Sequence, residues 1–293
     1  MVGWGIVCAG VAPAHAATPD VVRDRSDANE LQPAASGDYL VWSQGRSSYV
    51  KHEDDPRVRL NASGTRSFNA TIDGTTVVYQ SIGDRGSRLR VYDALSGERS
   101  RITRGVNTPA FETEPSLSGD WLLFTRVGPS RAKVVLFDLV AGTQRILADL
   151  TTRHHYLISD QVNDDWATWE SCDYADGRYS NCQVHRYRIS TQHAAVIPNT
   201  GRQQYAAGVD SDGTVYLVST GGTNRWTCGE RTKLVRQPRD GARKVIATLP
   251  DGVDSFNTFA FEETDGSVDL LFERLRCADG ASGIYEVEDA DTI

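Results

Sequence analysis

A degenerate repeat with six copies constrains the fold of this chain more than any other feature of the sequence. In each copy a short polar turn leads directly into an apolar or aromatic strand. The turns begin at Ser36, Asp73, Ser118, Asn163, Ser211 and Asp265. A spacing of roughly 35–50 residues between strand-dominated repeats is typical of β-propeller blades. We therefore predict an all-β, six-bladed β-propeller with four antiparallel strands in each blade.

The third repeat shows the expected four strands most clearly. They are predicted at residues 114–117, 121–127, 133–139 and 144–148. The second repeat follows the same order, with strands at 77–81, 88–93 and 99–103. Gly or Asp in the intervening turns supplies the positive φ that tight hairpins require. No break in composition marks a second domain, so we predict one propeller over residues 17–293.

The two ends of the chain suggest how the ring closes. The last repeat has a predicted third strand at 284–287, and only six residues follow it before the sequence ends at Ile293. The segment before the first blade has a surplus strand that contains Val21 and Val22. We predict that this strand completes the last blade, because closing the ring removes two exposed sheet edges. The alternative is an N-terminal tail outside the ring.

The first sixteen residues have the features of a cleavable signal peptide. Residues 3–11 are apolar, and Ala14-His15-Ala16 matches a cleavage site that would leave Ala17 as the new N-terminus. A basic segment before the apolar stretch is missing, which suggests that the start site is misassigned. Two alternatives are a buried strand or helix and a lipoprotein acylated at Cys8, although Val7 is a poor residue for the latter. We expect a secreted or periplasmic, envelope-located protein.

Cysteine usage agrees with export. Four cysteines remain after cleavage: Cys172, Cys182, Cys228 and Cys277. An even number in an exported chain favours disulfides. Cys172 and Cys182 flank a predicted hairpin loop at 173–181, and Cys228 and Cys277 would then join neighbouring blades. Free buried thiols are the alternative, whereas zinc is disfavoured because the chain has no C-x-x-C pair.

Charge and length exclude two classes of partner. The formal net charge is -8, and the arginines are scattered, so the chain lacks the positive field expected of a nucleic-acid binder. The apolar N-terminal stretch is too short to span a bilayer. We predict a monomer with no transmembrane segment and no cofactor.

Two repeats resemble a known family. In the second, Asp73-Gly74-Thr75-Thr76-Val77-Val78-Tyr79 is followed by Leu89-Arg90-Val91-Tyr92-Asp93 and Ser96-Gly97-Glu98. The third repeats this as Ser118-Gly119-Asp120-Trp121-Leu122-Leu123-Phe124, then 134–138 and Ala141-Gly142-Thr143. These motifs resemble those of TolB-like six-bladed propellers. The resemblance implies the fold and a periplasmic or secreted interaction protein, while the same propeller also occurs in peptidases and polysaccharide lyases.

Loops between consecutive blades are expected to gather at one end of the ring axis and form a ligand-binding mouth. Aromatic side chains precede the inner strands, with polar residues beside them, as is common in sugar and peptide sites. The candidates are Phe68, Asn69, Phe111, Glu112, Glu114, His154, His155, Tyr156, Gln203, Tyr205, Phe256 and Asn257. Alternatively, the aromatic rings wedge between blades and seal the core.

Three further hypotheses concern the chemistry of this mouth. His154-His155 with Glu112 and Glu114 could bind a metal, but adjacent strand residues point to opposite faces, so we predict no metal site. Glu112 and Glu114 could share a face and act with Asp254 as acid and base. We favour a non-enzymatic protein that binds an unknown protein or envelope glycan through the mouth. The alternatives are a lyase or glycosidase that uses mouth carboxylates, and a structural protein without a small ligand.

Overall fold

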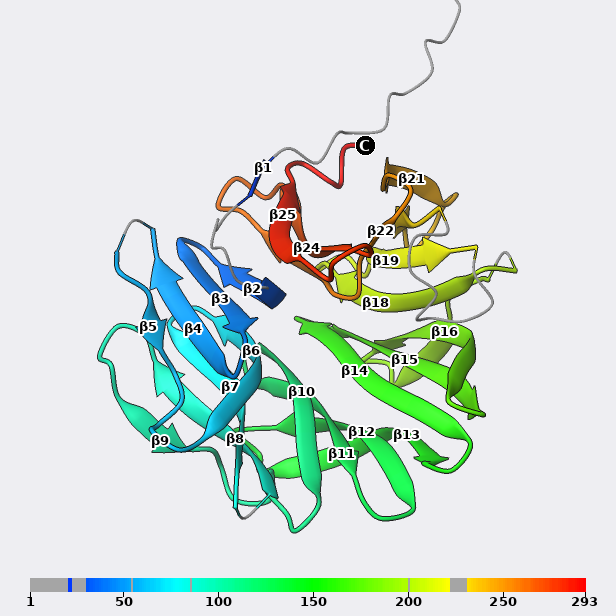
Figure 1. Ribbon diagram of the computed structural model, residues 1–293. Coiled ribbons are helices and arrows are strands. Elements are labelled where there is room, and N and C mark those ends of the chain that lie inside the picture. Colours follow the sequence, from blue (N-terminus) through cyan, green and yellow to red (C-terminus); the bar gives the residue numbers. More distant parts are fainter. Residues whose placement is uncertain (1–20, 23–29, 54, 85, 200, 222–230) are drawn as a thin grey trace, which may run out of the picture.

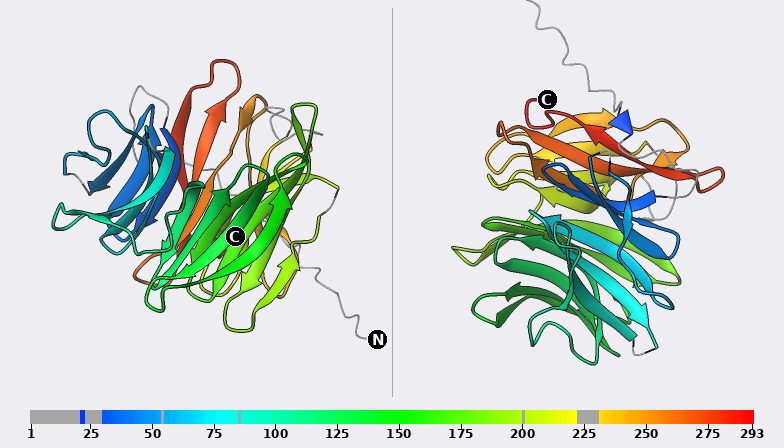
Figure 2. Two further views of the ribbon diagram at one scale, coloured as in Figure 1. Left: turned by 90° about the horizontal axis from the view of Figure 1, so that it is seen from below. Right: turned by 90° about the vertical axis from the view of Figure 1, so that its left-hand side faces the viewer.

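The chain forms a ring of six twisted antiparallel sheets around a central axis (Figures 1 and 2). The structure is a computed structural model that describes residues 21–22, 30–53, 55–84, 86–199, 201–221 and 231–293. Strands β2, β6, β10, β14 and β18 lie nearest the axis (Figure 1). No helix long and apolar enough to cross a bilayer occurs among these residues. The predicted six-bladed, all-β architecture is confirmed. The proposed signal peptide, residues 1–16, lies outside the described part.

Five blades contain four consecutive strands each, ordered from the axis outward. Blades one to three consist of β2 (Glu30–Ser36), β3 (Tyr39–Gln44), β4 (Ser47–His52) and β5 (Val58–Arg59); β6 (Arg66–Asp73), β7 (Thr76–Gly83), β8 (Gly86–Asp93) and β9 (Arg99–Arg101); and β10 (Phe111–Ser118), β11 (Trp121–Val127), β12 (Arg131–Asp138) and β13 (Thr143–Thr151). Blades four and five consist of β14 (His155–Asn163), β15 (Trp166–Ala175), β16 (Arg178–Arg188) and β17 (His193–Val196); and β18 (Gln203–Val209), β19 (Val215–Thr220), β20 (Lys233–Gln237) and β21 (Lys244–Thr248).

The sixth blade is assembled differently from the others. β23 (Thr258–Glu262), β24 (Val268–Arg276) and β25 (Ser282–Val287) are its three longest strands. β22 (Val253–Asp254) pairs with the far end of β24, so two short segments replace one continuous inner strand. On the other side β1 (Val21–Val22) runs antiparallel to β25, with Val21 opposite Glu286 and Val22 opposite Tyr285.

The apolar strand that marks each repeat is the second strand of its blade. It supplies fully buried side chains in every blade, among them Trp42, Val77, Phe124, Tyr216 and Phe272. These side chains pack between neighbouring sheets, and burying each one stabilises the fold by roughly 1.5–3 kcal/mol. The apolar residues of the repeat therefore form a hydrophobic core that runs around the ring between the blades.

The polar residue that opens several turns joins one blade to the next. Ser36, Asp73 and Ser118 accept hydrogen bonds from the backbone N–H groups of Gly74, Gly119 and Asp164, at 2.9, 2.8 and 3.0 Å. Each acceptor lies in one blade and each donor lies in the turn of the following blade. The small polar residues of the repeat thus hold neighbouring turns in register.

The inner strands of blades one to five each contain a β-bulge, which interrupts the alternation of side chains between the two faces of the sheet. The pairing shifts after Leu31, Phe68, Thr113, Ser159 and Tyr205, so two residues of the inner strand face one of the second strand. The first bulge residue has a positive φ in four blades: Gln32 (56°), Asn69 (48°), Glu114 (49°) and Ala206 (50°). A bulge re-aims side chains, and these side chains border the centre of the ring.

Candidate functional site

A cavity of about 240 Å³ lies on the axis, where the inner strands converge. Every blade contributes to its wall at or beside the inner-strand bulge. The bulge-level residues are Gln32, Asn69, Glu114, Asp160, Ala206, Phe256 and Asn257. Because each blade supplies at least one residue, the wall runs around the axis.

The wall is polar and includes two carboxyl groups. Glu114 and Asp160 come from neighbouring blades, and both are half-buried. Amide groups come from Gln32, Asn69 and Asn257, and no lysine, arginine or histidine lines the cavity within the described part of the chain. Aromatic rings from Tyr156, Phe256 and Phe259 complete the wall. This mixture of hydrogen-bonding groups and rings is typical of ligand sites.

Asn69 is held in one orientation by its neighbours. Its side-chain amide nitrogen donates to Gln80 Oε1 and Thr113 Oγ1, each at 3.1 Å. Its backbone N–H donates to Gln32 Oε1 and Ser43 Oγ, also at 3.1 Å. Asn69 is only 7% exposed, and its Oδ1 atom is buried without a hydrogen-bond partner in the described part of the protein.

Asn257 is tied to a buried carboxyl group behind the wall. Its side-chain amide donates to Glu273 Oε2 at 2.7 Å. Burial raises the pKa of Glu273 to about 7, while hydrogen bonds from the Asn257 side chain and the Gln32 backbone oppose the rise and the charge of Asp254 adds to it. A group that titrates near neutral pH therefore supports two wall residues, Gln32 and Asn257.

Tyrosines from blade four extend the site beyond the cavity. Tyr156 lines the cavity, and its ring meets that of Tyr179 edge-on with 4.6 Å between centroids. The ring centroid of Tyr174 lies 5.0 Å from that of Tyr179. Tyr174 and Tyr179 belong to the long hairpin of β15 and β16, which ends in a tight turn at Asp176 (φ 50°) and Gly177 (φ 75°). The hairpin thus brings an aromatic cluster to the cavity.

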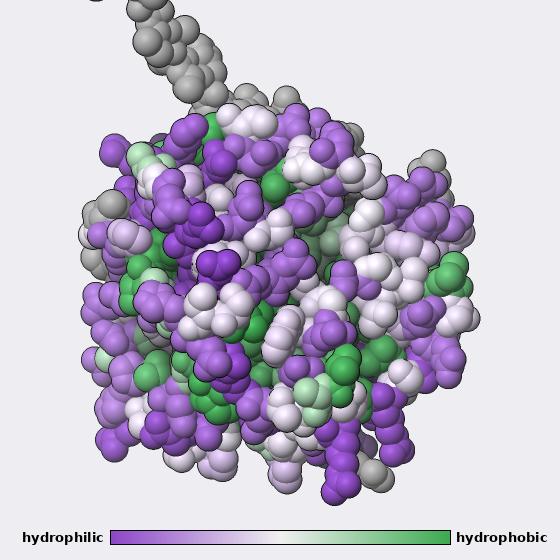
Figure 3. Space-filling view, turned by 180° about the vertical axis from the view of Figure 1, so that it is seen from behind, coloured by the Kyte–Doolittle hydropathy of each residue, from purple (hydrophilic) through white to green (hydrophobic). Residues whose placement is uncertain are grey.

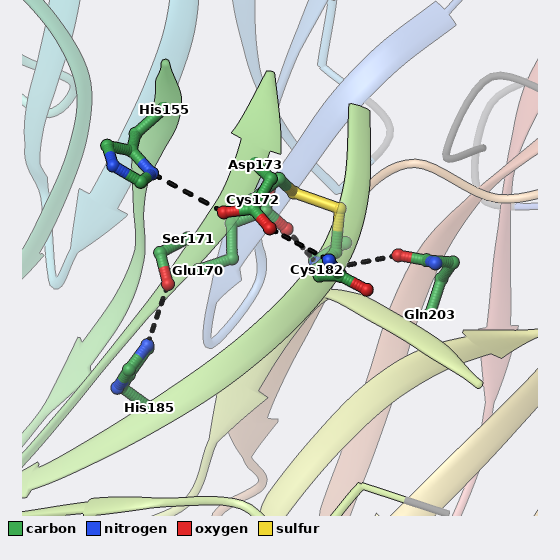
Figure 4. Close-up of a disulfide and its surroundings, with 10 residues drawn as sticks. His155, Glu170, Ser171, Cys172, Asp173, Cys182, His185 and Gln203 are labelled. Carbon is green, nitrogen blue, oxygen red and sulfur yellow. Dashed lines mark hydrogen bonds and ion pairs between the residues drawn. A yellow bond between two sulfur atoms is a disulfide. The ribbon is translucent and has the colours of Figure 1, made fainter. Parts of the chain in front are cut away.

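A disulfide joins the two strands of this hairpin, as expected. Cys172 and Cys182 are bonded, with their Cα atoms 4.0 Å apart (Figure 4). The loop expected at 173–181 is shorter, because β15 continues to Ala175 and β16 begins at Arg178. The Cys182 N–H donates to Gln203 Oε1 at 2.7 Å, which ties the hairpin to blade five. Cys277 lies in the turn after β24, and Cys228, its expected partner, is outside the described residues.

The structure brings five of the twelve sequence candidates together at the cavity. These are Asn69, Glu114, Tyr156, Phe256 and Asn257. The other seven do not line it: Phe68, Phe111, Glu112, His154, His155, Gln203 and Tyr205. Gln32 and Asp160 also line the cavity and were not candidates. They occupy the same place in their inner strands as Asn69 and Glu114, the first position of the bulge.

Glu112 and Glu114 have different surroundings, so the expectation that they share a face is not met. Glu112 is fully buried and accepts hydrogen bonds from the Thr108 N–H (3.0 Å) and hydroxyl (2.6 Å). Arg126 Nε lies 3.3 Å from its carboxylate. Glu114 lines the cavity instead. The bulge between Thr113 and Ser116 causes this difference, because it breaks the two-residue alternation of the strand.

Several other candidates stabilise the blades or lie at the surface. Tyr205 is fully buried; its hydroxyl donates to Asp254 Oδ1 at 3.2 Å, and its ring stacks on that of Phe256. His155 lies 3.5 Å from Asp173 (Figure 4), and His154 is in an exposed turn. Among the described residues no cluster of three or more His, Cys, Asp or Glu side chains is arranged to hold a metal.

The face of the molecule turned away in Figure 1 gives little sign of a large apolar docking surface. Figure 3 shows that face as mainly hydrophilic, with separate hydrophobic patches. The most exposed large hydrophobic residues, Leu95 and Val140, lie in hairpin turns of different blades. Scattered residues of this kind are normal on soluble proteins, so the axial cavity remains the strongest candidate site.

Comparison with known proteins identifies the fold. No protein-family model and no curated protein sequence matches this chain. A protein of Agrobacterium tumefaciens provisionally assigned as TolB has a similar structure (TM-score 0.59, 14% identity, covering 90% of this chain and 91% of that one). Oligogalacturonate lyase of Vibrio parahaemolyticus is also similar (TM-score 0.53, 12% identity, covering 92% of this chain and 79% of that one). So is a chain of the nidogen/laminin complex (TM-score 0.52, 13% identity, covering 83% of this chain and 91% of that one). The protein is thus a six-bladed β-propeller with a distant structural similarity to TolB propeller domains.

Proposed function

We propose that this protein is an exported binding protein that holds part of a protein or glycan ligand in its axial cavity. The observation that carries the proposal is the cavity wall, to which all six blades contribute and which has polar or aromatic side chains from five of them. A propeller that served only as a scaffold would gain stability from an apolar axis, since buried polar groups cost free energy unless they are hydrogen-bonded. The tyrosine cluster of blade four gives the ligand a second contact surface.

The cystine supports the exported location. Disulfides persist in oxidising compartments and are rare in the cytosol, and Cys172–Cys182 is fully enclosed by the fold. Removal of the first sixteen residues would expose Ala17 at the N-terminus. Terminal sequencing of the protein isolated from its native host tests this, and an intact cytosolic N-terminus would contradict export.

We also propose that the segment containing Val21 and Val22 closes the ring as the outer strand of blade six. The antiparallel pairing of β1 with β25 supports this. A variant that lacks residues 17–22 is expected to lose about 1–3 kcal/mol of stability, because the edge of β25 becomes exposed. Urea denaturation measures the loss, and an unchanged midpoint would argue for a tail outside the ring.

Blocking the cavity tests the binding function directly. Ile158 lines the cavity, so Ile158→Trp fills part of it with a bulky ring. Val140→Trp is the matched control, since Val140 lies in an exposed turn. Ligands are first found by envelope pull-down or glycan array. We expect Ile158→Trp to bind them roughly tenfold or more weakly than the wild type, and the control to bind them with unchanged affinity. Equal capture by both variants would remove the cavity from consideration.

The same ligands discriminate between binding and catalysis. Glycosidic bond cleavage generally needs two carboxyl groups that flank the bond, and Glu114 and Asp160 are the pair at the cavity. The binding proposal predicts that a captured glycan is released unchanged, as checked by mass spectrometry. Cleavage that disappears in Glu114→Gln would replace the proposal with a carbohydrate-active enzyme.

A further inference from the structure

We infer that the axial cavity holds a neutral sugar residue, bound by the amide side chains of Gln32 and Asn69; this inference depends on the proposed binding function. The two residues occupy the first bulge positions of β2 and β6, in neighbouring blades, and both line the cavity. A side-chain amide has one donor end and one acceptor end. The end that each side chain turns toward its protein neighbours therefore decides which end is left for a ligand.

The amide of Gln32 is oriented by a backbone group. Its Oε1 atom accepts a hydrogen bond from the Asn69 N–H at 3.1 Å. A backbone N–H can only donate, so rotating the Gln32 amide by 180° would place two donors against each other. Gln32 consequently presents its Nε2 group to a ligand, and no described residue accepts a hydrogen bond from that group.

The amide of Asn69 is oriented by a relay of hydrogen bonds that starts at a backbone carbonyl. The Ser87 hydroxyl donates its one proton to the carbonyl oxygen of Glu112, so Ser87 Oγ can only accept from its other neighbour. Gln80 Nε2 donates to Ser87 Oγ at 3.0 Å, which turns Gln80 Oε1 toward Asn69. Asn69 Nδ2 donates to that oxygen at 3.1 Å, and Asn69 Oδ1 is left without a donor in the described part of the protein.

Burial keeps this relay in one arrangement. Ser87, Gln80 and Asn69 are all buried, so water cannot replace one of the hydrogen bonds and allow an amide to turn. The bond between Gln32 and the Asn69 backbone also holds the two amides side by side. The wall thus offers a fixed donor on Gln32 next to a fixed acceptor on Asn69. A ligand that satisfies both has to accept one hydrogen bond and donate another.

This requirement separates the classes of ligand. A carboxylate or a phosphodiester can accept from Gln32 but has no proton to donate to Asn69, and an ammonium group can donate but cannot accept. The net charge of -8 also repels anionic ligands at long range. A hydroxyl group both donates and accepts, and a neutral sugar carries hydroxyl groups on adjacent carbons.

The geometry of the wall favours a sugar over a polypeptide main chain. The N–H and C=O of a trans peptide group point in opposite directions, so one peptide group cannot reach two amides that lie side by side. Pro33 and Phe259 add apolar surface to the same wall, against which the C–H face of a sugar ring can pack. The cavity volume of about 240 Å³ is below the roughly 300–1,000 Å³ of drug-sized sites, which suits a single sugar residue.

A glycan array provides the first test. The array carries neutral trisaccharides of the common hexoses, each with its uronic acid and amino-sugar counterpart, and is probed with the full protein. The counterparts keep most of the ring hydroxyls and add negative or positive charge. We expect at least one neutral trisaccharide to bind at least roughly tenfold more tightly than both of its counterparts, as measured by calorimetry.

A pair of glutamine variants connects this preference to the cavity. Gln32→Met removes the donor at similar side-chain length, while the Asn69 N–H keeps the Ser43 hydroxyl as an acceptor at 3.1 Å. We expect the variant to bind the neutral trisaccharide at least roughly tenfold more weakly. The matched control is Gln192→Met, since Gln192 has nearly the same φ as Gln32 (55° and 56°) but lies in an exposed turn. It should bind normally, and near-UV circular dichroism confirms that both variants are folded.

Deoxy sugars show whether Gln32 contacts the ligand or only shapes the cavity. Among the monodeoxy analogues of the bound residue, the one without the hydroxyl that meets Gln32 should bind the wild-type protein weakly. The same analogue should lose no further affinity in Gln32→Met, because the interaction is already absent. A residue that acted only on the shape of the cavity would weaken every analogue by the same factor.

The outcomes separate this inference from the proposed function. Failure of every neutral trisaccharide to bind, tighter binding of a charged counterpart, or unchanged binding by Gln32→Met would each overturn the sugar inference. If the ligand captured from the envelope is then a protein, and Ile158→Trp abolishes its capture, the binding function stands and only the sugar inference fails.

Discussion

Blades three and six both bury a carboxyl group, but they stabilise it in different ways. In blade three, Glu112 is fully buried, and Arg126 Nε and Arg88 Nη1 lie 3.3 and 3.9 Å from its carboxylate. In blade six, Glu273 is 2% exposed, accepts a hydrogen bond from Asn257 and lies near Asp254, another acid. Blade three thus compensates a buried charge with opposite charge, whereas blade six lowers the cost by favouring the protonated form.

The difference follows from what each carboxyl group holds. Glu112 accepts two hydrogen bonds from Thr108 and therefore fixes the loop that leads into the inner strand of blade three. Glu273 accepts its hydrogen bonds from residues of the cavity wall. Burial also raises the pKa of Asp269, in the same strand, to about 6. Blade six is therefore a part of the ring that should respond to pH.

The largest effect is expected from removing the carboxylate of blade three. Glu112→Ala leaves Arg126 without its buried partner and Thr108 without its acceptor. Breaking a buried ion pair in this way costs about 3–5 kcal/mol. Chemical denaturation monitored by tryptophan fluorescence measures the loss.

An exposed ion pair in the same blade is the matched control. Asp149 lies 2.6 Å from Arg131 Nε and is 36% exposed. Asp149→Ala should cost less than about 1 kcal/mol, because water screens such pairs. Similar losses for the two variants would show that Glu112 is not a structural anchor.

The same blade shows how far sequence reasoning reaches. Local patterns identified β11 at the residues it occupies, and the polar turn at Ser118. Both depend on short-range chemistry, since a buried strand needs consecutive apolar residues and a tight turn needs small polar ones. The start of β10 at Phe111 was missed, because Glu112 is polar and its burial depends on Arg88 and Arg126, which lie elsewhere in the chain.

The cavity was only partly predictable for a related reason. Glu114 and Asn69 were recognised as candidates, whereas Gln32 and Asp160 were not. The bulge decides which side chain reaches the axis, and no residue type marks it, since its first position holds Gln, Asn, Glu, Asp and Ala in successive blades. A positive φ at Gln32 and Ala206 becomes visible only in the folded backbone.

Glu273 of blade six should make the free energy of unfolding depend on pH. The pKa of Glu273 is about 7 in the folded protein, above its ordinary value, so the folded state binds a proton that the unfolded state releases. The free energy of unfolding should therefore fall as pH rises from about 4.5 to above 7. Glu273→Gln should remove most of this fall, so at about pH 8 the free energy of unfolding of the variant should exceed that of the wild type by roughly 3 kcal/mol.

Thermal melts of both proteins across that pH range test the assignment. Below about pH 4.5 the wild-type carboxyl is protonated in both states, so the two proteins should have similar stability. A smaller slope contributed by Asp269, whose pKa is about 6, should persist in the variant. Parallel curves for wild type and Glu273→Gln would mean that Glu273 is ionised in the folded protein, and the contrast with blade three would disappear.

The smallest effects are expected at the joints between blades. Ser118 in blade three accepts the Asp164 N–H at 3.0 Å, and Glu262 in blade six accepts the Ser211 N–H at 2.8 Å. Ser118→Ala and Glu262→Ala should each cost about 0.5–1 kcal/mol, because both bonds are exposed and water replaces the lost acceptor. Glu262→Ala should be the milder, since truncating a long side chain restores conformational entropy.

The joints are in different parts of the ring, so the double variant should show the sum of the two losses within about 0.5 kcal/mol. A clearly larger loss would indicate that the turns act together around the ring, and that blades three and six are coupled through it.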